Sequence, residues 1–147
     1  MSESEQPSES FASFENVTRE IWPWPNFSPA ELACKGSGRL VIAPAFMDRL
    51  QRLRDAFGEP LRVSSGYRSP AYNARVSSTG ADGPHTSGRA VDIAIAGADA
   101  FWLLGLALEH GFTGIGVRQS GPWDGRFLHL DDLEEAPGRP RPRLWSY

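Results

Sequence analysis

Apolar residues recur at helical spacing from residue 44 to residue 57, and polar residues occupy most of the positions between them. The apolar stripe consists of Phe46, Leu50, Leu53 and Phe57. This spacing is typical of a helix that packs one face on a core, and Gly58 is the residue type that commonly ends helices. The pattern therefore predicts an amphipathic helix over residues 44–57.

Shorter signals predict further helices. Ser28 and Glu31 form a capping box with Pro29 at the first helical position, so a short helix begins there. The segment "PAYNARVSS", residues 70–78, is typical of another short helix.

A second amphipathic helix is predicted after residue 98. Asp99 is the expected N-cap, and Gly111 closes the segment. The inward stripe is expected to include Phe101, Leu104 and Leu108.

Alternating apolar positions predict strands. Leu61 and Val63 alternate in one segment, and Val91, Ile93 and Ile95 share one face of another, with Asp92 on the opposite face. The segments "GFTGIGV" (residues 111–117) and "RFLHLDDL" (residues 126–133) are expected to be strands too. Helices and strands without strict alternation predict an α+β fold, in which helices flank a small antiparallel sheet.

The 147 residues match the size of one domain. Residues 1–20 are acidic, rich in serine and poor in aliphatic side chains, so we predict a flexible N-terminal tail followed by a single domain over 21–147. The Pro-rich segment 134–147 is expected to be extended, with Trp145 anchoring it to the domain.

Composition narrows the classes of partner. A net charge of −3 and the lack of a basic patch argue against nucleic-acid binding. No apolar run approaches the length of a membrane span, and the first ten residues do not resemble a signal peptide, so we expect cytoplasmic synthesis. We also expect a monomer. Cys34 is the single cysteine, so a metal would depend on histidine and carboxylate ligands.

Two of the three histidines have surroundings suited to a metal ligand. His85 lies in a polar loop, Asp92 lies on the polar face of a strand, and His129 shares a strand face with Phe127 and Asp131. Two histidines, one carboxylate and a water form a known catalytic zinc arrangement. The same residues also fit an ordinary structural pair, and His110 fits a helix C-terminus.

Three blocks in order, "SSGYRSPAYNARV", "GPHTSGRAVDI" and "RFLHLDD", resemble the zinc D-Ala-D-Ala carboxypeptidase family of peptidoglycan peptidases. That family includes phage endolysins and shares its fold with the hedgehog signalling domain. The resemblance covers roughly residues 26–147, and the ends of this region look like the small phage-encoded or prophage-encoded members. It implies a hedgehog/D-Ala-D-Ala peptidase-like fold, a Zn²⁺ cofactor and a bacterial peptidoglycan peptide as substrate.

The resemblance also implies residue roles. His85, Asp92 and His129 match the zinc ligands, and Arg68 matches an arginine that contacts the substrate near the scissile carbonyl. Many relatives carry a general base three residues before the last histidine ligand, where this chain has Arg126. Arginine cannot accept the proton, because it has no acceptor atom.

The remaining candidates for the base are Asp131 and Asp124. Asp131 is the first choice, because relatives of the small subgroup carry an aspartate there. Asp131 could instead orient His129 through the free nitrogen of its ring.

The resulting expectation is a zinc peptidase that hydrolyses stem peptides or cross-links of peptidoglycan, as a carboxypeptidase or as an endopeptidase of the endolysin type. It would reach the wall after release from the cell or as a virion component. The alternative is a module that retains the zinc fold and binds peptidoglycan, or a phage structural protein, without catalysis.

Overall fold

The computed structural model describes residues 8–147, and its central element is a five-stranded sheet with the strand order β3-β4-β6-β5-β7. The strands are β3 (Arg62–Ser65), β4 (Ala90–Ala94), β5 (Gly114–Arg118), β6 (Phe127–Asp131) and β7 (Arg143–Ser146). Neighbouring strands are antiparallel except β5 and β7, which are parallel. A separate two-stranded sheet pairs β1 (Glu9–Phe11) with β2 (Leu40–Ile42). The predicted α+β class is confirmed.

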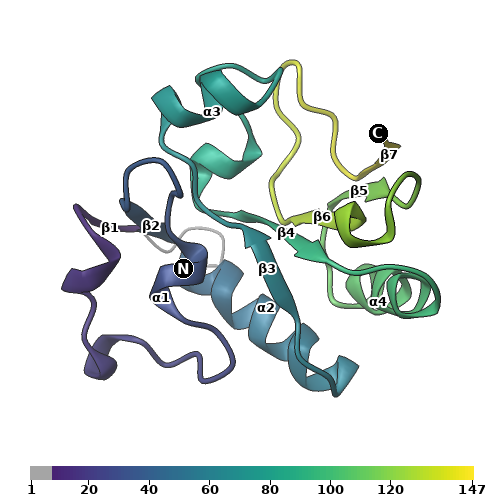
Figure 1. Ribbon diagram of the computed structural model, residues 1–147, viewed down its shortest axis with the longest axis horizontal. Coiled ribbons are helices and arrows are strands. Elements are labelled where there is room, and N and C mark those ends of the chain that lie inside the picture. Colours follow the sequence, from purple (N-terminus) through teal and green to yellow (C-terminus); the bar gives the residue numbers. More distant parts are fainter. Residues whose placement is uncertain (1–7) are drawn as a thin grey trace.

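The α-helices of the described chain are α1 (Pro29–Leu32), α2 (Pro44–Phe57), α3 (Pro70–Val76) and α4 (Ala98–Glu109). The Ser28 hydroxyl accepts a hydrogen bond from the backbone N–H of Glu31, as the capping box predicts. Gly58 ends α2 in the left-handed conformation, with φ of 78°. In Figure 1, α2 and α4 lie on one side of the five-stranded sheet, and α3 and the segment after β6 lie on the other.

The predicted cap of α4 was wrong, and of the three residues predicted to face inward only Leu104 packs against the core. Gly97 is the N-cap residue, and Asp99 lies in the first turn. Ala100, Leu103 and Ala107 are buried in the core, and Leu104 and Leu106 pack against it, whereas Phe101 and Leu108 are exposed. This helix is apolar on most of its circumference, so periodicity did not identify the inward face.

Alternation along the strands separates an apolar face from a polar one. Val91 and Ile93 of β4, with Leu128 and Leu130 of β6, are almost fully buried in the core. The intervening residues point to the opposite face, because side chains alternate along a strand. The sheet therefore turns its polar residues toward α3 and the segment that follows β6 (Figure 1).

The described part of the predicted N-terminal tail, residues 8–20, is packed on the domain. β1 pairs with β2, and two short 3₁₀ helices follow, η2 (Phe14–Asn16) and η3 (Arg19–Ile21). Phe11, Phe14 and Val17 pack against the core, so the folded region extends at least to residue 9 rather than beginning at residue 21. The rest of the predicted tail lies outside the described residues.

The Pro-rich segment after β6 returns to the sheet. Its last part forms β7 beside β5, which adds a parallel edge to the predicted antiparallel sheet. Among residues 8–147, no helix has the length and hydrophobicity needed to cross a membrane.

Candidate metal centre

Three predicted ligands meet on the polar face of the sheet. Asp92 of β4 lies directly opposite His129 of β6 in the antiparallel pairing. His85 comes from the 3₁₀ helix η4 (Pro84–Ser87), which precedes β4. Asp92 Oδ1 lies 3.2 Å from His85 Nε2 and 3.2 Å from His129 Nδ1. All three residues are buried, and one ligand atom from each lies within 4.8 Å of the others.

Hydrogen bonds outside the cluster hold both imidazole rings in place. His85 Nδ1 lies 2.8 Å from the Gly66 carbonyl oxygen, and His129 Nε2 lies 2.7 Å from Asp131 Oδ2. Both partners are acceptors, so each of these nitrogens carries a hydrogen. In the neutral rings, the other two nitrogens then direct their lone pairs at the Asp92 carboxylate.

The cluster therefore brings three acceptors to one point, an arrangement that a bound cation stabilises. Two histidine nitrogens and one carboxylate oxygen match the ligand atoms of catalytic zinc sites. The chemistry of this donor set fits Zn²⁺.

Contacts around the cluster shift the pKa values of Asp92 and His129. Burial alone would raise the pKa of Asp92, but the His129 and His85 rings, which donate hydrogen bonds to this carboxylate when they are protonated, outweigh burial and lower that pKa well below its usual range. Burial alone would lower the pKa of His129, but Asp131 and Asp92 outweigh it and raise the pKa.

Arg68 lies beside the cluster. Its Nη2 is 3.5 Å from Asp92 Oδ2, its Nε donates to the Ser65 hydroxyl and its Nη1 donates to the Asn73 side-chain oxygen. Asn73 is almost fully buried and donates in turn to Thr79 and to the Gly80 carbonyl. Asn73 thus connects Arg68 to the following loop, a role that the sequence analysis did not identify.

Asp131 lies behind His129, on the side of the ring away from Asp92. Asp131 is fully buried. Arg141 donates two hydrogen bonds to its carboxylate, from Nε to Oδ1 at 3.0 Å and from Nη2 to Oδ2 at 2.8 Å. Burial would raise the pKa of Asp131, but the hydrogen bonds from His129 and Arg141 outweigh it and lower the pKa to about 2.

Asp124, the other candidate for the base, and Arg126, at the position where relatives carry the base, do not line the cleft around the cluster. Asp124 belongs to the exposed 3₁₀ helix η5 (Trp123–Gly125). Arg126 donates to the Gly121 carbonyl and lies over the Trp123 ring. Both residues therefore lie outside the cleft that contains His85, Asp92 and His129.

That cleft has a volume of about 820 Å³. One wall is formed by residues 76–79 and 82–87, and the opposite wall by residues 136–139 and β7. Within the described chain, the carboxylates that line it are Asp82 and Asp92.

Two glycines of β5 make room for the site. In the sheet, Gly116 lies between His129 on β6 and Trp145 on β7. A Cβ atom on Gly116 would lie 2.6 Å from Trp145 Nε1, so only glycine lets the indole ring reach His129, where the ring centroids are 5.0 Å apart. A Cβ atom on Gly114 would clash with the Asp131 carboxylate. The "GIG" pattern in this strand was the overlooked signal.

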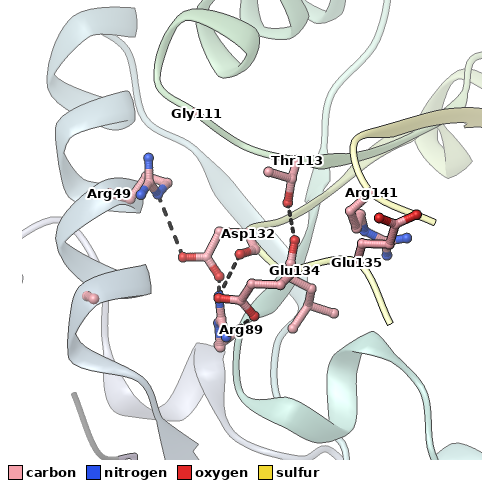
Figure 2. Close-up of a pocket in the computed structure, with 10 residues that line it drawn as sticks. Arg49, Arg89, Gly111, Thr113, Asp132, Glu134, Glu135 and Arg141 are labelled. Atoms are coloured by element: carbon pink, nitrogen blue, oxygen red, sulfur yellow. Dashed lines mark hydrogen bonds and ion pairs between the residues drawn. The ribbon is translucent and has the colours of Figure 1, made fainter. Parts of the chain in front are cut away.

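A smaller cavity of about 280 Å³ lies near the end of β6 (Figure 2). There Asp132 pairs with Arg89 at 2.8 Å and with Arg49 at 3.6 Å. Arg89 also binds Glu134, and the Thr113 hydroxyl donates to the Leu133 carbonyl. These contacts fix the chain immediately after Asp131, where it begins its path to β7.

Comparison with known proteins agrees with this geometry. The sequence profile of the family described as Peptidase M15 matches residues 25–131, which include every ligand of the cluster. The chain belongs to the Peptidase M15 family. No curated protein and no solved structure gives a significant match. The family membership confirms the resemblance seen in the sequence. The matched region contains the His85, Asp92 and His129 cluster, whose three ligand atoms could hold a metal ion.

Proposed function

We propose that this Peptidase M15 member is a zinc-dependent hydrolase of peptide bonds in the stem peptides or cross-links of bacterial peptidoglycan. The observation that carries the proposal is the convergence of His85, Asp92 and His129 at an open cleft. Bound there, Zn²⁺ would supply a nucleophile at neutral pH by lowering the pKa of a water molecule, and would polarise the scissile carbonyl.

Arg68 has a distinct role in this proposal. Its guanidinium stands beside Asp92 and is held by Ser65 and Asn73, so it is already oriented before substrate arrives. A preorganised cation at this position stabilises negative charge that develops on the carbonyl oxygen during hydrolysis.

Asp131 acts in this proposal as a positioning residue for His129. Its carboxylate accepts from His129 Nε2 and is tied to Arg141, with no exposure to the cleft. A carboxylate so placed keeps the hydrogen of the ring on Nε2 and the lone pair of Nδ1 toward the metal ligands. This is the second of the two roles that the sequence allowed for Asp131.

The decisive experiment is mass spectrometry of the fragments released from purified peptidoglycan by the zinc-loaded protein. We expect soluble peptides whose masses identify one cleaved bond. Asp92→Asn removes a ligand charge and should abolish release, whereas Asp99→Asn, an exposed aspartate on α4, should not. Release by Asp92→Asn at the wild-type rate would refute the proposal.

A second function, peptidoglycan binding without turnover, is favoured by one observation. Asp131 is buried behind His129, and Asp124 does not line the cleft, so neither candidate base faces the cluster. Sedimentation of the zinc-loaded protein with peptidoglycan, without release of fragments, would support this function instead. Detection of the protein in purified virions would support a role as a virion component.

A further inference from the structure

The cleft carries an excess of positive charge in a protein whose net charge is −3. Its arginines are Arg68, Arg118, Arg139, Arg141 and Arg143, and its carboxylates in the described chain are Asp82 and Asp92. A cleft lined by one sign of charge concentrates ligands of the opposite sign. The local charge therefore favours an anionic ligand although the whole chain is acidic.

Three of these arginines already interact with other groups of the protein. Arg68 forms an ion pair with Asp92, Arg141 forms one with Asp131, and Arg139 donates a hydrogen bond to the Glu134 carbonyl. Arg118 and Arg143 differ, because both are exposed and no carboxylate of residues 8–147 forms an ion pair with either. Their guanidinium groups are available to a ligand.

The strand register places these two arginines on either side of the row that contains Asp92 and His129. That row runs from Asp92 through His129 and Gly116 to Trp145. Arg143 lies two residues before Trp145 on β7, and Arg118 lies two residues after Gly116 on β5. Residues two apart on a strand share a face and are about 7 Å apart, so each arginine lies roughly two residues of extended peptide from the central row.

Aromatic rings fill the space between the arginines. The Arg143 guanidinium lies over the Trp145 ring at 5.2 Å from its centroid, and Tyr147 packs against both Trp145 and Phe127. Phe127 lies opposite Arg118 in the sheet. A peptide crossing this surface would meet a cation at each end and an apolar surface between them.

We propose that Arg118 and Arg143 bind carboxylates of the substrate, so that the cleft selects peptides with free carboxylates over the same peptides with amidated carboxylates. The inference rests on the proposed function, whose substrate class it narrows. Arginine suits this role because its planar fork matches the two oxygens of a carboxylate and stacks on aromatic rings.

The test compares two synthetic peptides, L-Ala-γ-D-Glu-L-Lys-D-Ala-D-Ala and the same peptide with both carboxylates converted to carboxamides. Binding to the full chain, with and without Zn²⁺, is measured by isothermal titration calorimetry, and hydrolysis is followed in the same samples by mass spectrometry. Arg118→Gln and Arg143→Gln are the test variants. Arg126→Gln is the matched control, because it removes the same charge close to the cleft without lining it.

We expect the wild-type protein to prefer the peptide with free carboxylates. Arg118→Gln and Arg143→Gln should each weaken binding of the peptide with free carboxylates by about 2- to 5-fold, the range for solvent-exposed ion pairs, and should leave the amidated peptide nearly unaffected. Arg126→Gln should retain the wild-type preference. The preference should also decrease with added salt.

Equal affinity of the wild-type protein for both peptides would overturn the inference. A loss with Arg126→Gln as large as with the test variants would also overturn it, because net charge alone would then explain the preference. If the preference holds but neither peptide nor purified peptidoglycan is hydrolysed, the inference stands and the proposed catalytic function fails.

Discussion

Replacing Gly116 with alanine tests whether this position makes room for the aromatic wall of the cleft. The added Cβ atom would lie 2.6 Å from Trp145 Nε1, 2.7 Å from Trp145 Cε2 and 2.9 Å from Tyr147 Cε2. These separations are well inside van der Waals contact, so β7 or its rings must move. Overpacking of this kind costs about 1–3 kcal/mol.

The matched control is Gly105→Ala. Gly105 lies in the middle of α4, and nothing lies within 4 Å of a Cβ atom placed there. Alanine in a helix is more stable than glycine by about 1 kcal/mol, because glycine loses more conformational entropy on folding. The same substitution should therefore have opposite effects at the two positions.

Urea denaturation of the metal-free protein measures both effects as changes in the free energy of unfolding. For a chain of this length, a change of 1 kcal/mol corresponds to a shift in Tm of roughly 2–4 °C. Gly116→Ala should also weaken peptide binding, because Trp145 and Tyr147 line the cleft. An unfolding free energy for Gly116→Ala equal to that of the wild type would refute the reasoning about close approach.

The remaining predictions concern the metal centre and α4. Asp131→Asn should weaken Zn²⁺ binding by about 10- to 100-fold, since it replaces the carboxylate that orients His129, and Asp124→Asn should not; competition with a chromogenic chelator measures both. Zn²⁺ at 100 times its Kd should stabilise the protein by about 2.7 kcal/mol, seen as a higher Tm. The stabilisation by Zn²⁺ should decrease as the pH falls from 8 to 5, because the pKa of His129 is raised and protons then compete with Zn²⁺ for its ring nitrogen. A stabilisation that does not depend on pH would contradict the ligand assignment. Leu103→Ala should cost about 2–5 kcal/mol, whereas Leu108→Ala should cost less than about 0.5 kcal/mol; similar losses in urea denaturation would contradict the observed face of α4.

Local patterns predicted the elements whose signals are strong and short in range. The stripe from Phe46 to Phe57, with Gly58 after it, predicted α2 to the residue. Ser28 and Pro29 located α1 because capping depends on atoms only three residues apart. The same reasoning failed for α4, where apolar residues on most faces left its orientation to packing against the sheet and α2.

The candidate site shows the same division. His85, Asp92 and His129 were identified from residue type and order, and the structure brings them together. Asp131 was placed on the correct strand face, but its isolation from the cleft depends on Arg141, ten residues away along the chain. No local pattern reports such a contact.

The amino-acid sequence by itself determined which residues could bind a metal and that the chain belongs to a peptidase family. It also determined the strand alternation that directs Asp92 and His129 away from the core. These follow from residue chemistry and from periodicities of two and 3.6 residues. Only the tertiary structure decided the register that sets His129 opposite Asp92 and the return of β7 beside β5. Pairing between distant segments depends on how the whole core packs, and it was this pairing that placed Trp145 and Arg143 at the cleft.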